Sequence, residues 1–319
     1  MLEMYYLGID LGGTNIAAGI VNDEFTIVKK GSVPTLATRE PSDILDDMAK
    51  LCLSVIEEAG LTVDDIEYAG IATPGTANHD TGVVVYANNL PFLNYPIADE
   101  LRARVPFKAV YIENDANAAA KGEAVAGAAR GTSNSVMITL GTGVGGGIII
   151  DNKVYSGFNY AGAELGHMII VADGRRCSCG LKGCWEAYSS ATALIKMTKE
   201  AMDRNPDTIM WAMCNGNSAS VSGRTAFNAM RQGDMVAAEV IDSYIDYLAC
   251  GIINIINIFC PEVLSIGGGI SNEKDRLLDM LLPRIGMRTY SSNSPHRTLI
   301  KIAELGNDAG IIGAAALHI

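Results

Sequence analysis

The sequence is short of basic residues. Its 319 residues include 24 Lys and Arg against 36 Asp and Glu, which gives a formal net charge of −12. Nucleic acids and anionic membranes attract positively charged protein surfaces. The charge balance therefore argues against both partners, and we expect a protein that binds neither nucleic acid nor membrane.

Long apolar runs and leader-like segments are also lacking. The longest apolar stretch, residues 248–259, is too short to span a bilayer. Met1–Tyr6 has neither a basic segment nor a long apolar one, so we expect no signal peptide. Four of the seven cysteines are scattered in apolar or helical contexts, namely Cys52, Cys214, Cys250 and Cys260. We interpret them as reduced thiols of a cytoplasmic protein.

The common nucleotide-binding fingerprints are missing. No Walker A motif occurs, and no Gly-x-Gly-x-x-Gly lies between a strand and a helix. Gly141–Gly146 has that glycine spacing, but β-branched residues 148–150 follow it. The segment is therefore predicted to be a hairpin and not a dinucleotide site.

Strand-like and helix-like segments alternate along the chain. Apolar residues spaced by three and four predict a helix over residues 42–59. A predicted strand at 109–112 is followed by a polar turn and an Ala-rich helix at 116–126. Other predicted strands are the pair within 5–21, then 25–28, 66–72, 83–86, the pair within 138–150, 263–266 and 299–303; other predicted helices are 97–104, 186–202, 226–232, 235–259 and 308–318. This pattern indicates an α/β protein.

A glycine-rich hairpin occurs twice. Leu11-Gly12 recurs as Leu140-Gly141, 129 residues later, within the similar segments 9–21 and 138–150. The repeat suggests two related domains. Because glycine has no Cβ, backbone N–H groups of both turns could approach one polyphosphate, with hydroxyl donors from Thr14 and Thr142. Asp10 could hold Mg²⁺ through water. The alternative, that the glycines only make tight hairpins, stays open.

Asp115 follows a strand and precedes a helix, where α/β proteins place ligands. Its neighbour Asn114 and the loop at Asn89 indicate a polar pocket. A carboxylate there could take the proton of an attacking hydroxyl group, as phosphoryl transfer to an alcohol requires. The residues alone leave a second interpretation open, in which Asp115 only caps the helix.

The cysteine cluster has the most specific spacing in the chain. Cys177-x-Cys179-x4-Cys184 has His167 ten residues upstream. These are the ligand types and number of a closed, structural zinc site. Free thiols are the alternative, although redox cysteines more often have the Cys-x-x-Cys spacing.

Together these motifs resemble the ROK family (repressors, open reading frames and kinases), in particular its bacterial ATP-dependent glucokinases. The resemblance covers essentially the whole chain. It rests on Gly8–Thr14, Glu113–Asn117, Leu140–Gly147, Glu164–His167, Cys177–Glu186 and Gly267–Gly269. It implies a two-domain actin-like ATPase (ribonuclease H-like) fold, with duplicated mixed-sheet domains and a cleft between them. The implied domains are residues 1–116, completed by a C-terminal helix at about 304–319, and residues 117–303 with the zinc loop.

The resemblance also implies the reaction and its residues. Glucose or a related hexose would be phosphorylated by ATP at the 6-hydroxyl group, with Asp115 as the base. The implied sugar contacts are Gly75, Asn89, Asn114, Asp115, Glu164, His167 and Glu186. The implied ATP contacts are Gly12, Gly13, Thr14, Asn15, Gly141, Thr142, Gly143, Gly268 and Gly269. His167 would use one ring nitrogen for zinc and the other for the sugar, and a homodimer or homotetramer is expected.

Two positions depart from the pattern of this family. Phe92 stands where many members have Trp, and Thr139 stands where other sugar kinases of this fold often have Asp. The first leaves open another sugar, such as N-acetylmannosamine, fructose or allose, and the second gives Asp10 more of any metal-binding role. A non-catalytic, sugar-responsive regulator is a further alternative. It is disfavoured by the acidic charge and by a chain that opens directly on the first hairpin.

Overall fold

The computed structural model describes residues 4–319, so Met1–Glu3, part of the segment searched for a signal peptide, lie outside the described residues. The chain divides into two compact units. The first comprises residues up to 137, together with 147–163 and 303–319, and the second comprises 138–146 and 164–302.

Five strands form the large sheet of the first unit, in the order β3-β2-β1-β4-β8. The first three make an antiparallel meander, while β4 and β8 continue the sheet in parallel. Their bounds are β1 (Tyr5–Leu11), β2 (Asn15–Asn22), β3 (Ile27–Pro34), β4 (Ile66–Thr73) and β8 (Val110–Asn114). The third strand begins later than predicted because the Asn22 side chain accepts the N–H groups of Glu24 and Thr26 and closes a turn there.

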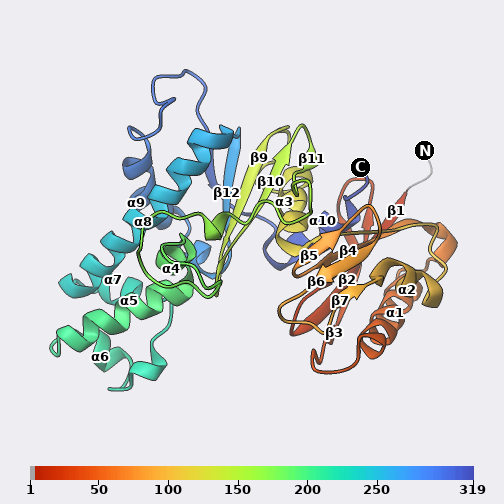
Figure 1. Ribbon diagram of the computed structural model, residues 1–319, viewed down its shortest axis with the longest axis horizontal. Helices are drawn as coiled ribbons and strands as arrows, with labels where there is room; N and C mark the ends of the chain where they lie inside the picture. Colours follow the sequence, from red (N-terminus) through yellow and green to blue (C-terminus); the bar gives the residue numbers. More distant parts are fainter. Residues whose placement is uncertain (1–3) are drawn as a thin grey trace. The chain divides into compact units, whose positions relative to one another are not determined.

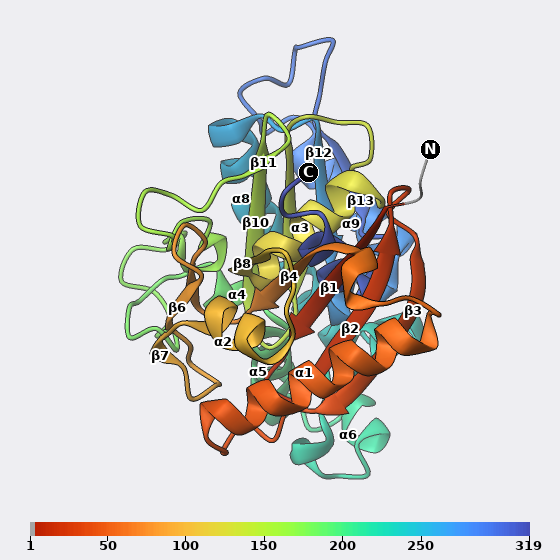
Figure 2. The same cartoon turned by 90° about the vertical axis from the view of Figure 1, so that its right-hand side faces the viewer.

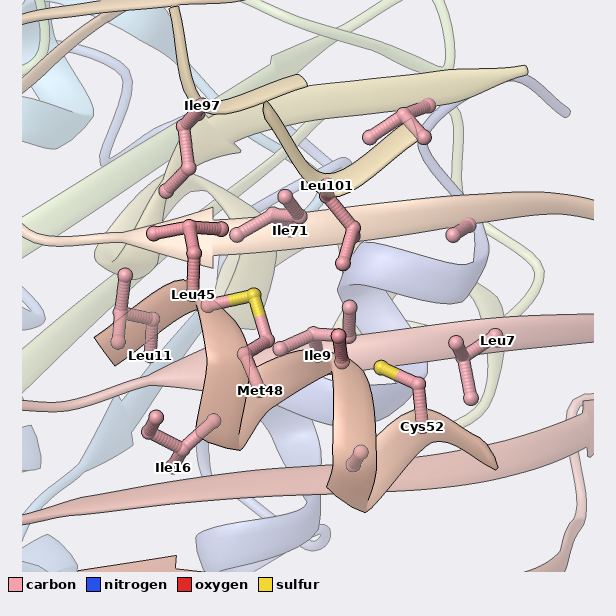
Figure 3. Packing of buried hydrophobic residues seen from close by; sticks show 14 of the residues in the cluster. Leu7, Ile9, Leu11, Ile16, Leu45, Met48, Cys52, Ile71, Ile97 and Leu101 are labelled. Carbon is pink, nitrogen blue, oxygen red and sulfur yellow. The ribbon is translucent and has the colours of Figure 1, made fainter. Parts of the chain in front are cut away.

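Helices cover both faces of this sheet. On one face lie α1 (Pro41–Glu58), which runs across β1 and β2 in Figure 2, and α2 (Ile97–Arg104). Alternate residues of β1, Leu7, Ile9 and Leu11, are fully buried beneath α1 in the core that Figure 3 shows. This is the two-residue period of a strand. The residues between them, including Gly8 and Asp10, face α10 (Ala309–Ala315) on the other side.

Glycines bring α10 very close to its neighbours. A Cβ on Gly8 would lie 1.9 Å from the carbonyl oxygen of Ile311. A Cβ on Gly313 would lie 1.7 Å from the carbonyl oxygen of Ala118 in α3 (Asp115–Val125). The helix after residue 303 therefore packs within the first unit. The same packing places α3, which the expected division at residue 116 assigned to the second domain, in the first compact unit.

The second large sheet repeats the strand order of the first. Its order is β11-β10-β9-β12-β13, and β12 and β13 are parallel, like β4 and β8. The bounds are β9 (Ser135–Leu140), β10 (Val144–Ile150), β11 (Lys153–Val154), β12 (Val263–Gly267) and β13 (Leu299–Ile302). Each sheet thus opens with a glycine-turn hairpin, and the predicted duplication is present. A third sheet, β5 (Thr76–Asn78), β6 (Val83–Tyr86) and β7 (Leu93–Tyr95), belongs to the first unit.

The helices of the second unit gather around α8 (Met235–Phe259), which packs against α5, α7 and α9 (Figure 1). The others are α4 (Glu186–Ser189), α5 (Ala191–Arg204), α6 (Met210–Met213), α7 (Thr225–Arg231) and α9 (Asp275–Ile285). The predicted helix over 186–202 is interrupted at Ser190, whose hydroxyl group caps α5. Among the described residues, no helix is both long and apolar enough to cross a membrane.

Candidate functional site

The turn between β8 and α3 separates the two interpretations of Asp115. Asn114, not Asp115, caps the helix: its Oδ1 accepts the N–H groups of Ala116 at 2.9 Å and Asn117 at 3.2 Å. Asp115 is the first helical residue, and its carboxylate accepts the Ala116 N–H at 2.8 Å. Burial raises the pKa of Asp115, against the opposing effect of hydrogen bonds from Ala116 and Asn114. A carboxylate with a raised pKa is suited to general-base chemistry.

Glu113 supports this turn from within the protein. Its side chain is buried, and its Oε1 accepts the N–H of Asn114 at 2.8 Å and the Nδ2 of Asn117 at 3.1 Å. Its Oε2 lies 3.3 Å from Nδ1 of His79, and this contact raises the pKa of His79. Sequence reasoning did not assign a role to Glu113, although it stands in the Glu-Asn-Asp segment used for the resemblance.

Gly75 and Asn89 lie near this turn and the first hairpin turn, respectively. The Nδ2 of Asn114 donates a hydrogen bond to the carbonyl oxygen of Gly75 at 3.0 Å. Gly75 has a φ of +87°, and a Cβ there would lie 2.0 Å from the carbonyl oxygen of Tyr86, so only glycine fits. A Cβ on Gly13 would lie 3.6 Å from the Cβ of Asn89. The polar loop is therefore adjacent to the first glycine turn.

The first glycine turn is fixed through its carbonyl groups. The N–H of Gly12 donates to the carbonyl oxygen of Asn15 at 2.9 Å, and the hydroxyl group of buried Thr35 donates to the carbonyl oxygen of Gly12 at 2.6 Å. Gly13, Thr14 and Asn15 are exposed. The turn is thus an ordered and accessible segment, which the binding of phosphate groups by N–H donors requires.

Asp10 stands directly before this turn and faces α10. Burial, together with the negative charge of Asp115, raises the pKa of Asp10 to about 6. A Cβ on Gly310 would lie 2.6 Å from Oδ2 of Asp10, so this glycine makes room for the carboxylate. A divalent cation would favour the ionised form of such a group. Asp10 is therefore a residue that could hold Mg²⁺.

The second glycine turn lies beside the Gly268–Gly269 loop. Gly141 donates its N–H to the carbonyl oxygen of Gly143 at 3.0 Å, which closes the turn. Gly268 has a φ of +83°, and a Cβ there would lie 2.6 Å from the backbone N of Leu140. The second glycine turn, predicted to contact the phosphates, and the Gly268–Gly269 loop, predicted to contact the adenosine, are therefore neighbours within the second unit.

The four predicted zinc ligands converge. The ligand atoms of His167, Cys177, Cys179 and Cys184 all lie within 4.8 Å of one another. Cys177 Sγ is 3.7 Å from His167 Nδ1, and Cys179 Sγ is 3.6 Å from Cys184 Sγ. Zinc–sulfur and zinc–nitrogen bonds in a tetrahedral site place ligand atoms about 3.5–3.8 Å apart. The donor set and its spacing therefore fit zinc, and Nδ1 of His167 is the nitrogen that faces it.

Zinc would bind these cysteines as thiolates. Burial raises the pKa of Cys184 to about 12, so zinc binding would have to displace the proton of this thiol. The loop is anchored independently by Trp185, which is fully buried and donates its Nε1–H to the carbonyl oxygen of Tyr247 in α8 at 3.0 Å.

Glu186 follows the last cysteine, and its carboxylate has three polar neighbours, one of which is the Cys177 sulfur at 3.4 Å from Oε1. Its Oε2 accepts the N–H of Val144 in the second glycine turn at 3.1 Å, and its Oε1 accepts the hydroxyl group of Ser178 at 2.9 Å. Glu164 is exposed and its carbonyl oxygen accepts the N–H of His167 at 3.0 Å. Glu164, His167 and Glu186 thus lie in one segment, residues 164–186, which contains the four clustered donors and is called the metal loop below. Sequence reasoning did not identify Ser178.

The two residues that depart from the family pattern have ordinary environments. Phe92 is buried and its ring lies 5.1 Å from that of Tyr95, so it belongs to the core of the first unit. Thr139 is half-buried within β9. Neither position adds a charged group to the sites described above.

Comparison with known proteins gives a consistent result. Residues 6–319 match the model of the ROK family. A glucokinase of Thermotoga maritima is 34% identical to this chain, and the alignment covers 99% of this chain and 98% of that protein. An N-acetylgalactosamine kinase of Shewanella sp. is 31% identical, with 98% and 96% covered.

A solved structure extends the likeness to three dimensions. The ROK family glucokinase from Streptomyces griseus, in complex with glucose and AMPPNP, is 34% identical to this chain. The two structures share a TM-score of 0.79, and 98% of each chain is covered. With the two mixed sheets of equal strand order, this likeness confirms the predicted actin-like ATPase fold.

Proposed function

The chain belongs to the ROK family, in which it is a sugar kinase, and we propose that it transfers the γ-phosphoryl group of ATP to the 6-hydroxyl group of glucose. The observation that carries the chemistry is the turn at residues 113–115. Asn114 caps the helix there. The Asp115 carboxylate, whose pKa is raised, therefore remains available as a proton acceptor.

In the proposed reaction Asp115 accepts the proton of the sugar hydroxyl group as its oxygen attacks the γ-phosphorus. The bond from that phosphorus to the bridging oxygen breaks, and ADP leaves with the electron pair. Backbone N–H groups of the turns at 12–15 and 141–143 hold the phosphate groups, and Gly268 and Gly269 contact the adenosine. Asp10 is the residue that would hold Mg²⁺, through water, and the ion would supply positive charge to neutralise the phosphate groups.

We assign sugar recognition to the remaining polar residues. Carboxylates and imidazole nitrogens are good partners for sugar hydroxyl groups because they accept hydrogen bonds strongly. The proposed contacts are Gly75, Asn89, Asn114, Glu164, His167 and Glu186. His167 and the three cysteines would hold zinc, which would have a structural role in this scheme: it would fix the loop that carries Glu186.

The test of the base is Asp115→Ala. Removing the carboxylate should leave glucose binding measurable by calorimetry but lower turnover to less than about one per cent, because general-base catalysis contributes roughly 10²–10⁴-fold. Asp115→Asn is the matched control for side-chain size and should lose turnover equally. Activity above a few per cent of wild type in either variant, with the fold intact, would exclude Asp115 as the base.

A second substrate class is supported by one observation. The Shewanella relative, 31% identical, is named for an acylaminosugar and not for glucose. Phosphorylation of an acylaminosugar or another hexose would use the same base and the same turns. The ratio of kcat/KM values for the competing sugars distinguishes the two proposals. A homodimer or homotetramer stays a prediction, which light scattering can test.

A further inference from the structure

The second glycine turn and the start of the helical segment after the metal loop form one hydrogen-bonded assembly. The N–H of Ala191 donates to the carbonyl oxygen of Gly141 at 2.8 Å. The hydroxyl group of Thr192 donates to the carbonyl oxygen of Thr142, also at 2.8 Å. With the bond from Val144 N–H to Glu186, the turn is tied to residues 186–192 at three points. Hydrogen bonds thus directly connect the turn proposed to bind phosphate with Glu186, which is proposed to bind the sugar.

The Glu186 carboxylate is held from two sides. Val144 N–H donates to Oε2, and the Ser178 hydroxyl group donates to Oε1, which also lies 3.4 Å from the Cys177 sulfur. A cysteine that binds a metal does so as a thiolate and can no longer donate a hydrogen bond. The Val144 N–H and the Ser178 hydroxyl group are then the donors that fix the carboxylate.

Gly143 provides the space for this arrangement. A Cβ at this position would lie 2.3 Å from Oε2 of Glu186, which is closer than real Cβ atoms approach. Any side chain there must push the carboxylate away from Val144. Gly141, in the same turn, differs in this respect because a Cβ on it would meet no atom within 4 Å. The two glycines of one turn therefore have separable effects on Glu186.

We propose that Ser178 and Gly143 are positioning residues for sugar recognition, because they set the orientation of the Glu186 carboxylate. The inference rests on the proposed function, in which Glu186 contacts the sugar. Its consequence is that a position in the phosphate turn controls sugar affinity even when no nucleotide is bound. By thermodynamic linkage, any factor by which a nucleotide on this turn changes sugar affinity equals the factor by which the sugar changes nucleotide affinity.

The test is equilibrium glucose binding without nucleotide, measured by calorimetry on purified protein. Gly143→Ala and Ser178→Ala should each raise the Kd for glucose by about tenfold, because a misoriented Glu186 carboxylate loses its proposed hydrogen bond to the sugar. Ser178→Thr keeps the hydroxyl group and should restore most of the affinity. Gly141→Ala tests the turn itself, because its Cβ would not reach Glu186, and it should weaken glucose binding clearly less than Gly143→Ala does. Zinc content and melting temperature of each variant are recorded, so that a general defect of the loop is recognised.

The outcomes separate this inference from the proposed function. Equal glucose affinity in wild type, Gly143→Ala and Ser178→Ala would overturn the inference alone. Weakening by Gly141→Ala as large as that by Gly143→Ala would also overturn it, because the effect would then belong to the turn and not to Glu186. A wild-type protein that bound neither glucose nor any other hexose would overturn the proposed function and this inference with it.

Discussion

At the scale of single residues, the role proposed for the Asp115 carboxylate depends on which residue caps the helix. From the sequence, Asp115 was equally suited to capping and to chemistry. The two cannot be told apart by residue type, since Asn and Asp are both good caps. The structure gives the cap to Asn114, whose side chain also reaches Gly75. Asp115 then has one oxygen on the Ala116 N–H and remains available at the start of the helix.

The acid limb of the pH–rate profile reports on this carboxylate. Asp115 must be ionised to accept a proton, and burial raises its pKa, so kcat/KM should fall as the pH drops through a value above the usual range for aspartate. Asn114→Ala removes a hydrogen bond that lowers this pKa, so the limb should move to higher pH. The measurement is kcat/KM from pH 4 to 8, with folding checked at each pH. A limb that stays in place, or moves to lower pH, would contradict the assignment.

Residue types and spacing were sufficient to identify the metal cluster, but not the residues that support the site. Cys-x-Cys-x4-Cys with an upstream His is too specific to arise from core packing, and its four donors converge as predicted. Glu113, Ser178 and His79 carry no such spacing. The contact between His79 and Glu113 joins residues far apart in the chain, and the contact between Ser178 and Glu186 depends on how the loop between them folds, so only the structure reveals them.

At the scale of elements, glycine-mediated packing holds α10 to its neighbours. Gly313 lies against Ala118 of α3, and a Cβ would meet the carbonyl carbon at 2.4 Å. The sequence predicted a small-residue helix at this place and could not show which partner it packs against. Small residues permit close approach of backbones, but they do not determine which element packs against the helix.

Gly313→Ala should destabilise the first unit. The added methyl group overlaps backbone atoms that cannot move independently, so a loss of about 2–4 kcal/mol is expected. The matched control is Gly223→Ala, whose Cβ would meet the flexible end of the Ile270 side chain at 3.3 Å. Chemical denaturation of both variants makes the comparison. If Gly313→Ala unfolds at the same denaturant concentration as wild type, the proposed packing of α10 is wrong.

The metal loop is the second element with a direct test. We expect purified protein to contain about one equivalent of zinc per chain, as a four-ligand site requires. Removal by a chelator should speed amide hydrogen exchange in residues 167–186 and leave exchange in β1 and β4 unchanged, because metal binding and folding of the loop are coupled. Less than half an equivalent of zinc, with the cluster thiols freely titratable, would count against the site.

Among helices and strands, the failures of prediction have identifiable causes. α9 (Asp275–Ile285) was not predicted because it contains Pro283 and follows a glycine-rich segment. Its buried residues, Leu277, Leu281 and Ile285, nevertheless have the spacing of a helix. The strands β5 and β7 have three residues each, too few for any periodicity to show. The interruption at Ser190 was missed because Ser is tolerated in helices as well as at their starts.

At the scale of the whole chain, the repeated glycine hairpin was the strongest indication of the fold in the sequence. A period of 129 residues predicted two related sheets, and both have the same order of strands. The extent of each compact unit was not accessible in this way, because it depends on packing between α3 and α10. The identity of the sugar depends on a few hydroxyl contacts that residue type alone does not fix.

The most direct test of the account is sugar-dependent ADP production, measured with a panel of sugars at saturating ATP and Mg²⁺. The panel comprises glucose, fructose, allose, N-acetylmannosamine and N-acetylgalactosamine, and the phosphorylated products are identified by their position of substitution. We predict that glucose gives the highest kcat/KM and that the product is glucose 6-phosphate. A preference of tenfold or more for another sugar would contradict the assignment of glucose, and no stimulation by any sugar would contradict the proposed sugar kinase itself.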